Sequence, residues 1–103
     1  MSTLVDFTIA PMDKGESVSP YVARAVAIIR DSGLPYRLGP MATTIEGAWD
    51  VVMAVITRCF EALAPDCNRI SISLKVDYRK NAADRLQGKL DSVRHHLADL
   101  PGG

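Results

Sequence analysis

The stretch Ile70–Arg79, with the sequence ISISLKVDYR, alternates apolar and polar residues with a period of two. Because successive side chains of a β-strand point to opposite faces, this pattern predicts a long strand whose apolar face lies toward a core. The apolar positions are Ile70, Ile72, Leu74, Val76 and Tyr78. Solvent, another subunit or a small ligand must cover the polar face, and the stretch by itself leaves these alternatives open.

Further periodic segments predict a complete order of elements. Strands are expected at 3–10, 36–38, 42–45 and 69–79, and helices from 19 to 33, from 46 to 65 and from 83 to 97. Ser19 can cap the first helix, Pro20 fits its first turn, and Gly33 can end it. The order is the βαββαβ arrangement of an α+β, ferredoxin-like fold, with a four-stranded antiparallel sheet and an extra C-terminal helix. We expect residues 1–103 to form a single domain.

The same patterns predict which residues are buried. In this fold two helices cover one face of the sheet, so the apolar rows Val5/Phe7/Ile9 and Ile70/Ile72/Leu74/Val76 are expected beneath them. The stripe of the second helix is expected to be Trp49, Met53, Ile56, Phe60 and Leu63. The third helix has its own stripe, Leu86, Leu90, Val93 and Leu97, which either extends the core or packs against a second subunit.

The residues of the polar sheet face favour a contact with another molecule over a surface covered by solvent alone. It is expected to carry small residues, Ser71 and Ser73, followed by the charges of Lys75, Asp77 and Arg79. An oligomer interface with a polar pocket at its edge would explain both features.

Composition excludes several classes of partner and site. Twelve basic residues balance twelve acidic ones, so a nucleic-acid partner is not expected. No apolar run is long enough for a membrane span and the N-terminus does not resemble a signal peptide, so we expect no membrane partner and a cytoplasmic location. Cys59 and Cys67 are expected to be buried or idle thiols, and adjacent His95 and His96 diverge on a helix, so no metal site is predicted.

Several polar residues lie where elements begin or end. Thr43, Thr44 and Glu46 come at the predicted junction of a strand and a helix, where Thr43 and Glu46 either form a capping box or contact a ligand. Ser17 and Ser19 precede the first helix and have the same two alternatives. Tyr36 either packs at a sheet edge or stacks on a flat ring.

Four motifs resemble a family of small thiamine-binding proteins, formerly uncharacterised, over about residues 4–98. They are Ser17-Val18-Ser19, Gly33-Leu34-Pro35-Tyr36, Pro40-Met41 with Thr43 and Glu46-Gly47, and Lys75-x-Asp77-x-Arg79. The chain departs from the family pattern at Ala42, where glycine is usual, and at Tyr78, where an acidic residue is frequent.

The resemblance implies a ferredoxin-like fold, dimers of dimers, and binding of thiamine or its hydroxymethylpyrimidine moiety, with no cofactor required and no established catalysis. The residues it implies for the ligand are Ser17, Ser19, Tyr36, Met41, Thr43, Thr44, Glu46 and Asp77. Their hydroxyls can pair with the amine and ring nitrogens of an aminopyrimidine, a carboxylate can accept from the amine, and Tyr36 can stack on the ring. Lys75, Asp77 and Arg79 serve either the ligand or an ion-pair ladder across an interface.

Two other functions remain open from the sequence. A cofactor-free enzyme on a dimeric ferredoxin-like scaffold would use Glu46, Asp77 or a histidine as acid or base, with a raised carboxylate pKa. A structural or regulatory subunit would use the polar face only as an interface.

Overall fold

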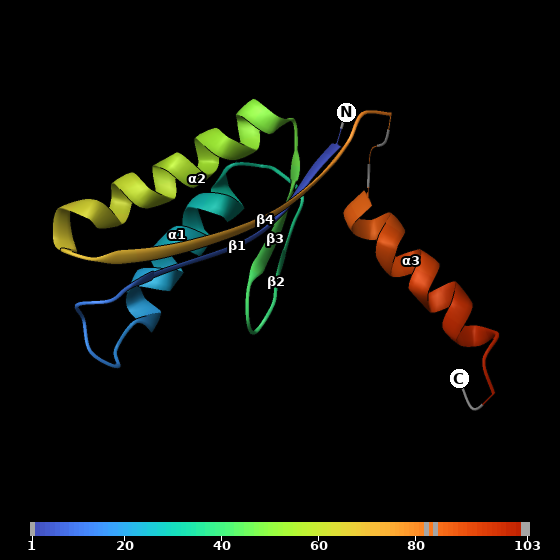
Figure 1. The fold of residues 1–103 in the computed structure, drawn as a ribbon, viewed down its shortest axis with the longest axis horizontal. Helices are drawn as coiled ribbons and strands as arrows, with labels where there is room; N and C mark the ends of the chain where they lie inside the picture. Colours follow the sequence, from blue (N-terminus) through green and yellow to red (C-terminus); the bar gives the residue numbers. More distant parts are fainter. Residues whose placement is uncertain (1, 82, 84, 102–103) are drawn as a thin grey trace.

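A computed structural model describes residues 2–81, 83 and 85–101 of the chain (Figure 1). Its elements are β1 (Ser2–Pro11), α1 (Ser19–Asp31), β2 (Tyr36–Leu38), β3 (Thr43–Gly47), α2 (Trp49–Leu63), a short 3-10 turn η1 (Ala64–Asp66), β4 (Ile70–Arg79) and α3 (Arg85–Ala98). The predicted order of strands and helices is therefore confirmed. The first helix ends as expected, because Gly33 adopts a positive φ of 78° just beyond it.

The four strands form one antiparallel sheet in the order β2-β3-β1-β4. This is the strand order of the ferredoxin-like fold, in which each of the first two helices connects strands that are not neighbours in the sheet. Helices α1 and α2 lie together on one side of the sheet, whereas α3 lies apart from them and its C-terminal end extends away from the other elements (Figure 1).

The main core lies between the sheet and the α1–α2 pair. Val5, Phe7 and Ile9 are buried there, as their alternation predicts, together with Ala25 and Ile29 of α1. Both cysteines are buried and neither forms a disulfide, in agreement with the prediction.

The predicted packing stripe of α2 is wrong for two aromatic residues. Trp49 and Phe60 are exposed at 52% and 44%, and the buried side chains of the helix are Val52, Val55, Ile56, Cys59 and Leu63. The helix is apolar around much of its circumference, so several stripes with helical spacing were available. The structure buries the stripe rich in smaller and β-branched side chains and turns the two aromatic rings outward.

The junction before α2 also differs from the prediction. Glu46 lies in β3, and α2 begins only at Trp49, so Thr43 and Glu46 form no capping box. The register pairs Glu46 with Leu4 of β1, which continues the strand through this segment. Likewise, α1 has no side-chain cap, and Ser19 is its first residue.

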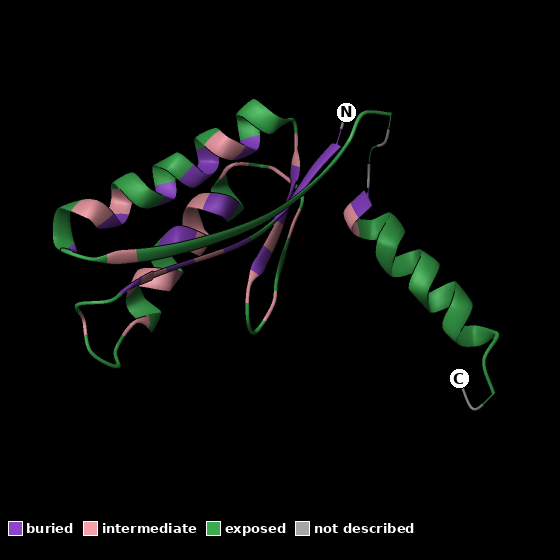
Figure 2. Ribbon diagram, in the orientation of Figure 1, coloured by how far each residue is buried: buried purple, intermediate pink, exposed green. Residues whose placement is uncertain are grey.

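Strand β4 is more exposed than predicted. Ile70 packs against the core, but Ile72, Leu74, Val76 and Tyr78 are each exposed by more than a third. Their register with β1 places them on the same face as Val5 and Phe7. The two helices cover the middle of the sheet and leave this edge strand uncovered, so its apolar row is a surface of the molecule (Figure 2).

The third helix lies against β1 and β3 on the polar side of the sheet. It covers Leu4, which is 6% exposed although it belongs to that face. Leu86 at its start is half-buried, whereas Leu90, Val93 and Leu97 are exposed. The helix therefore contributes little apolar burial, and most of its stripe stays uncovered. None of the described helices is both long and apolar enough to cross a membrane, and the cytoplasmic location stays a prediction.

Candidate functional site

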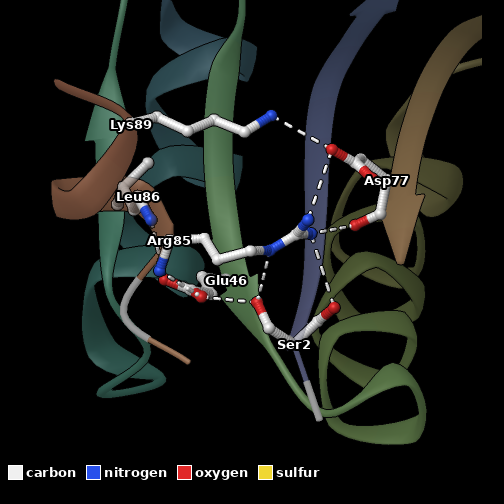
Figure 3. A network of polar contacts seen from close by, with 6 residues as sticks. All are labelled: Ser2, Glu46, Asp77, Arg85, Leu86 and Lys89. Atoms are coloured by element: carbon white, nitrogen blue, oxygen red, sulfur yellow. Dashed lines mark hydrogen bonds and ion pairs between the residues drawn. The ribbon is translucent and has the colours of Figure 1, made fainter. Parts of the chain in front are cut away.

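A buried polar network fixes the start of α3 to the sheet (Figure 3). The carboxylate of Glu46 accepts hydrogen bonds from the backbone N–H groups of Arg85 and Leu86, at 2.8 and 3.0 Å. The Ser2 hydroxyl donates to the same carboxylate at 2.5 Å. The first N–H groups of a helix have no partners within it, so Glu46, on the face of the sheet that α3 contacts, caps the start of α3.

Arg85 completes this network from the helix side. Its guanidinium donates to the backbone carbonyls of Ser2 and Asp77, and its side chain is only 6% exposed. It also forms an ion pair with the Asp77 carboxylate at 3.3 Å. Lys89, one helical turn later, reaches the same carboxylate at 3.0 Å. The arginine therefore links α3 to the N-terminal end of β1 and to β4.

Both carboxylates of the network are held in the ionised form. Burial opposes ionisation of Glu46, but the hydrogen bonds from Ser2, Leu86 and Arg85 outweigh it and lower its pKa. Hydrogen bonds from Lys89 and Arg85 lower the pKa of Asp77. These directions suit groups that serve as fixed negative partners for an arginine and a helix N-terminus.

A cavity of about 230 Å³ lies between α1 and the turn that joins β2 to β3. Phe7, Ile9, Ala25 and Ile29 are among its apolar walls, and the turn residues Gly39–Ala42 close one side. An adjoining groove of about 370 Å³ follows α1 outward and shares Val22, Val26 and Leu38 with it. We refer to this cavity as the α1 cavity.

Three predicted ligand residues meet at the α1 cavity. Met41 and Thr43 line it, and Ser19 lines the adjoining groove. Thr43 is the register partner of Phe7, so its side chain lies on the helix-covered face, where it is buried. Among the described residues, the buried hydroxyl that lacks a hydrogen-bond partner is that of Thr3, not that of Thr43. Ser17 is exposed and lines none of the described cavities.

The other four predicted residues do not join this group. Thr44 and Asp77 lie on the polar face and line a different cavity, beneath α3. Tyr36 packs against the main core from β2, which matches the alternative of an aromatic residue packed in the sheet. Glu46 is committed to the α3 network. The predicted set therefore divides between the two faces of the sheet.

The cavity beneath α3 has a volume of about 620 Å³, and we call it the α3 cavity. A row of four side chains crosses the whole sheet along its floor. Strand pairing places Arg37 beside Thr44, Thr44 beside Asp6, and Asp6 beside Lys75. Leu86, Lys89 and Leu90 of α3 face this row across the cavity.

Sequence reasoning missed Ser2, Arg37 and Arg85 as functional candidates. Arg85 lies in an exposed-looking amphipathic helix, and its burial depends on where that helix meets the sheet. Arg37 is aligned with Thr44 only through the pairing of β2 with β3. No group of three or more His, Cys, Asp or Glu residues among the described positions is arranged to hold a metal ion.

Comparison with known proteins adds an independent finding. A family model described as thiamine-binding protein matches residues 5–94. A UPF0045 protein of Mycobacterium bovis is 42% identical over 98 residues, which cover 94% of this chain and 96% of the relative. A UPF0045 protein of the fungus Eremothecium gossypii is 34% identical over 101 residues, covering 96% of each chain.

Solved structures share the fold. A hypothetical protein from Methanocaldococcus jannaschii superposes with a TM-score of 0.82 at 28% identity, covering 89% of this chain and 95% of its own. A Thermotoga maritima protein, provisionally assigned to thiamine biosynthesis or salvage, has a TM-score of 0.80 at 22% identity, with 90% and 99% coverage. The same fold is thus found in solved structures from an archaeon and a bacterium.

Proposed function

The chain belongs to the thiamine-binding protein family, and from this membership we propose that it binds thiamine or its hydroxymethylpyrimidine moiety in the α1 cavity without catalysing a reaction. The observation that supports this most is the position of Thr43, which is 6% exposed and lines a mainly apolar cavity. Small-molecule sites are mostly apolar and contain a few polar groups that orient the ligand.

The size of the cavity suits one ring more closely than two. Its volume of about 230 Å³ is below the roughly 300–1,000 Å³ range of sites for drug-sized ligands. The aminopyrimidine ring would occupy the cavity, where the Thr43 hydroxyl can donate to a ring nitrogen or accept from the amine. The thiazolium of thiamine would extend into the adjoining groove beside Ser19. Arg30 also lines that groove, but Asp31 neutralises it through a 2.9 Å ion pair.

Glu46 is assigned a different role from the one expected. Both of its carboxylate oxygens accept hydrogen bonds within the α3 network, and it lies on the opposite sheet face from Thr43. A carboxylate that already accepts three hydrogen bonds is poorly placed to accept another from the amine of the ligand. We therefore propose that Glu46 stabilises α3 and that Thr43 contacts the ligand.

Calorimetric titration of ligand-free protein with thiamine and with hydroxymethylpyrimidine tests this function. We expect saturable heat at one site per chain, and weaker binding in Thr43→Val. Removing one neutral hydrogen bond should weaken binding by about five- to tenfold. Thr44→Val is the matched control, because the neighbouring threonine faces the other side of the sheet. Absence of heat from both compounds at millimolar concentration would refute the function, and equal weakening by both variants would refute the location.

The enzyme alternative has less support. A general acid near neutral pH needs a raised carboxylate pKa, whereas the pKa values of Glu46 and Asp77 are lowered by their partners. Both groups are also occupied in holding α3. We therefore retain the binding function.

We further propose that the protein self-associates through β4, as a step toward the expected dimer of dimers. This strand forms one edge of the sheet, and its ten residues carry the exposed apolar row from Ile72 to Tyr78. An uncovered edge strand with an apolar face is a ready surface for pairing with another strand. A second copy of β4 would pair with its free backbone groups and place a second apolar row beside the first.

A further inference from the structure

We propose that the α3 cavity is a second ligand site, separate from the proposed thiamine site, and that it takes a small organic anion in which a phosphate or carboxylate is joined to an apolar ring. The cavity is on the opposite face of the sheet from Thr43, so the two sites do not share walls. The inference does not depend on the proposed function.

Among the described residues, two cations around the cavity have no carboxylate partner. Arg37, Lys75 and Lys89 line it together with the carboxylates Asp6 and Asp77. Asp77 already pairs with Lys89 and with the buried Arg85.

The remaining carboxylate does not neutralise the other cations. Asp6 accepts a hydrogen bond from Thr44 at 3.2 Å, and although it is the register partner of Lys75, the two form no ion pair within 4.0 Å in the described part of the chain. Arg37 donates to the neutral amide of Gln87 at 2.6 Å. With respect to the described carboxylates, Arg37 and Lys75 therefore lie at the two ends of the row with charge available for an anion.

The other walls of the cavity are apolar. Leu4 lies in the floor, and Leu86 and Leu90 of α3 lie across from it. An inorganic ion would leave this apolar surface uncovered, whereas a ring would bury it and gain free energy in proportion to the area covered. A volume of about 620 Å³ is within the range of sites for small organic ligands.

The α3 network holds these walls in place before any ligand arrives. The helix start is fixed by Glu46, and Arg85 ties it to β1 and β4 (Figure 3). A cavity whose walls are already positioned loses less entropy on binding. The network thus explains why buried charges are found at the base of an otherwise exposed helix.

Phenyl phosphate is the minimal probe, with inorganic phosphate and phenol as its two halves. We would follow backbone amide shifts by NMR while titrating each compound into the full chain. We expect phenyl phosphate to bind more tightly than either half and to shift the amides of Asp6, Thr44 and Leu86. Shifts confined to Phe7, Thr43 and the β2–β3 turn would assign the probe to the α1 cavity and overturn the proposal.

Substitutions distinguish an anion site from a cation site. Lys75→Met should weaken phenyl phosphate binding by about fivefold, the loss of roughly one exposed ion pair. Asp6→Asn should strengthen it, because a repelling carboxylate is removed. Lys80→Met is the matched control, since Lys80 is exposed on the turn after β4 and does not line the cavity. Unchanged binding in Lys75→Met, or weaker binding in Asp6→Asn, would overturn the proposal.

Two natural ring classes can then be compared. Thiamine monophosphate and adenosine monophosphate both join a ring to a phosphate, and each can be titrated in the same way. Tighter binding of either compound than of phenyl phosphate would support the site and identify the class of its ligand. Thiamine binding at the α1 cavity should be unchanged in Lys75→Met. Weaker thiamine binding in Thr43→Val with phenyl phosphate binding unchanged would show that the two sites are separate.

Discussion

The Glu46 carboxylate accepts a hydrogen bond from the backbone N–H of Arg85, with 2.8 Å between Oε2 and the nitrogen. A glutamate in β3 therefore caps a helix that begins 39 residues later. This contact joins the centre of the sheet to α3 on its polar face. Glu46→Gln keeps the shape but replaces a carboxylate with a neutral amide that accepts hydrogen bonds more weakly. We expect a loss of about 1–3 kcal/mol in the free energy of unfolding, measured by urea denaturation. Glu61→Gln, at an exposed position of α2, is the control and should change stability little. Equal stability of the two variants would contradict the assigned role of Glu46.

Acid should weaken the same network. The folded-state pKa of Glu46 is lowered from 4.5, so its contribution to stability is fully present above the unfolded-state pKa and is lost as the pH falls through the folded-state pKa. We expect the urea midpoint to hold above about pH 5 and to fall below about pH 4. Asp77 adds to this fall because its pKa is also lowered. In Glu46→Gln the decline should be shallower, and an identical pH profile in wild type and variant would argue against the assignment.

Arg85 should control the docking of α3 more than the stability of the main core. Arg85→Met removes the contacts to Ser2 and Asp77 and leaves Asp77 with Lys89 alone. We expect amide hydrogen exchange in α3 to accelerate on the order of a hundredfold, while the amides of α2 stay protected. Arg85→Lys should recover part of the protection, because a lysine can reach one partner but not all of them. Uniform acceleration in both helices would show that the arginine supports the whole domain.

The exposed row of β4 should control self-association. Leu74→Lys places a charge on that row and should lower the oligomer mass measured by light scattering over a range of protein concentrations. Ser73→Lys is the matched control, since Ser73 is the adjacent residue on the opposite face. If both variants lower the mass equally, the polar face contributes to the interface as well. If neither does, β4 is not the interface.

Cys59 should be unreactive in the folded protein. Burial raises the pKa of its thiol to about 11, and the thiol donates a hydrogen bond to the Ala25 carbonyl at 3.5 Å. At pH 8 only about one thiol in a thousand would be ionised, so alkylation by iodoacetamide should proceed only as the protein unfolds. Mass spectrometry of the labelled peptide checks this. Rapid labelling of Cys59 under native conditions would contradict its burial.

The strands were predicted well because their signal is local. Alternation in residues 3–10 and 69–79 matches β1 and β4 closely, and Gly33 ends α1 as expected. The segment before α2 failed because Thr43-x-x-Glu46 has the spacing of a capping box, whereas sheet pairing with Leu4 keeps Glu46 in a strand. Here tertiary hydrogen bonding outweighed a short-range motif.

The candidate site was predicted only in part for a similar reason. Thr43 and Thr44 are adjacent in the sequence, but the pleat sends their side chains to opposite faces. Met41 and Thr43 therefore belong to the α1 cavity, and Thr44 to the α3 cavity. A list of polar residues cannot show this division until the register of the strands is known.

The amino-acid sequence by itself determined the order of strands and helices, the buried face of β1 and the family resemblance, because periodicity and motif residues act over a few neighbouring positions. Only the tertiary structure decided which face each helix covers, that β4 remains exposed, and that Glu46 and Arg85 meet. These outcomes depend on contacts between residues 39 or more positions apart. Such contacts form only when burial and hydrogen bonding across the whole domain outweigh the entropy lost in ordering the chain between them.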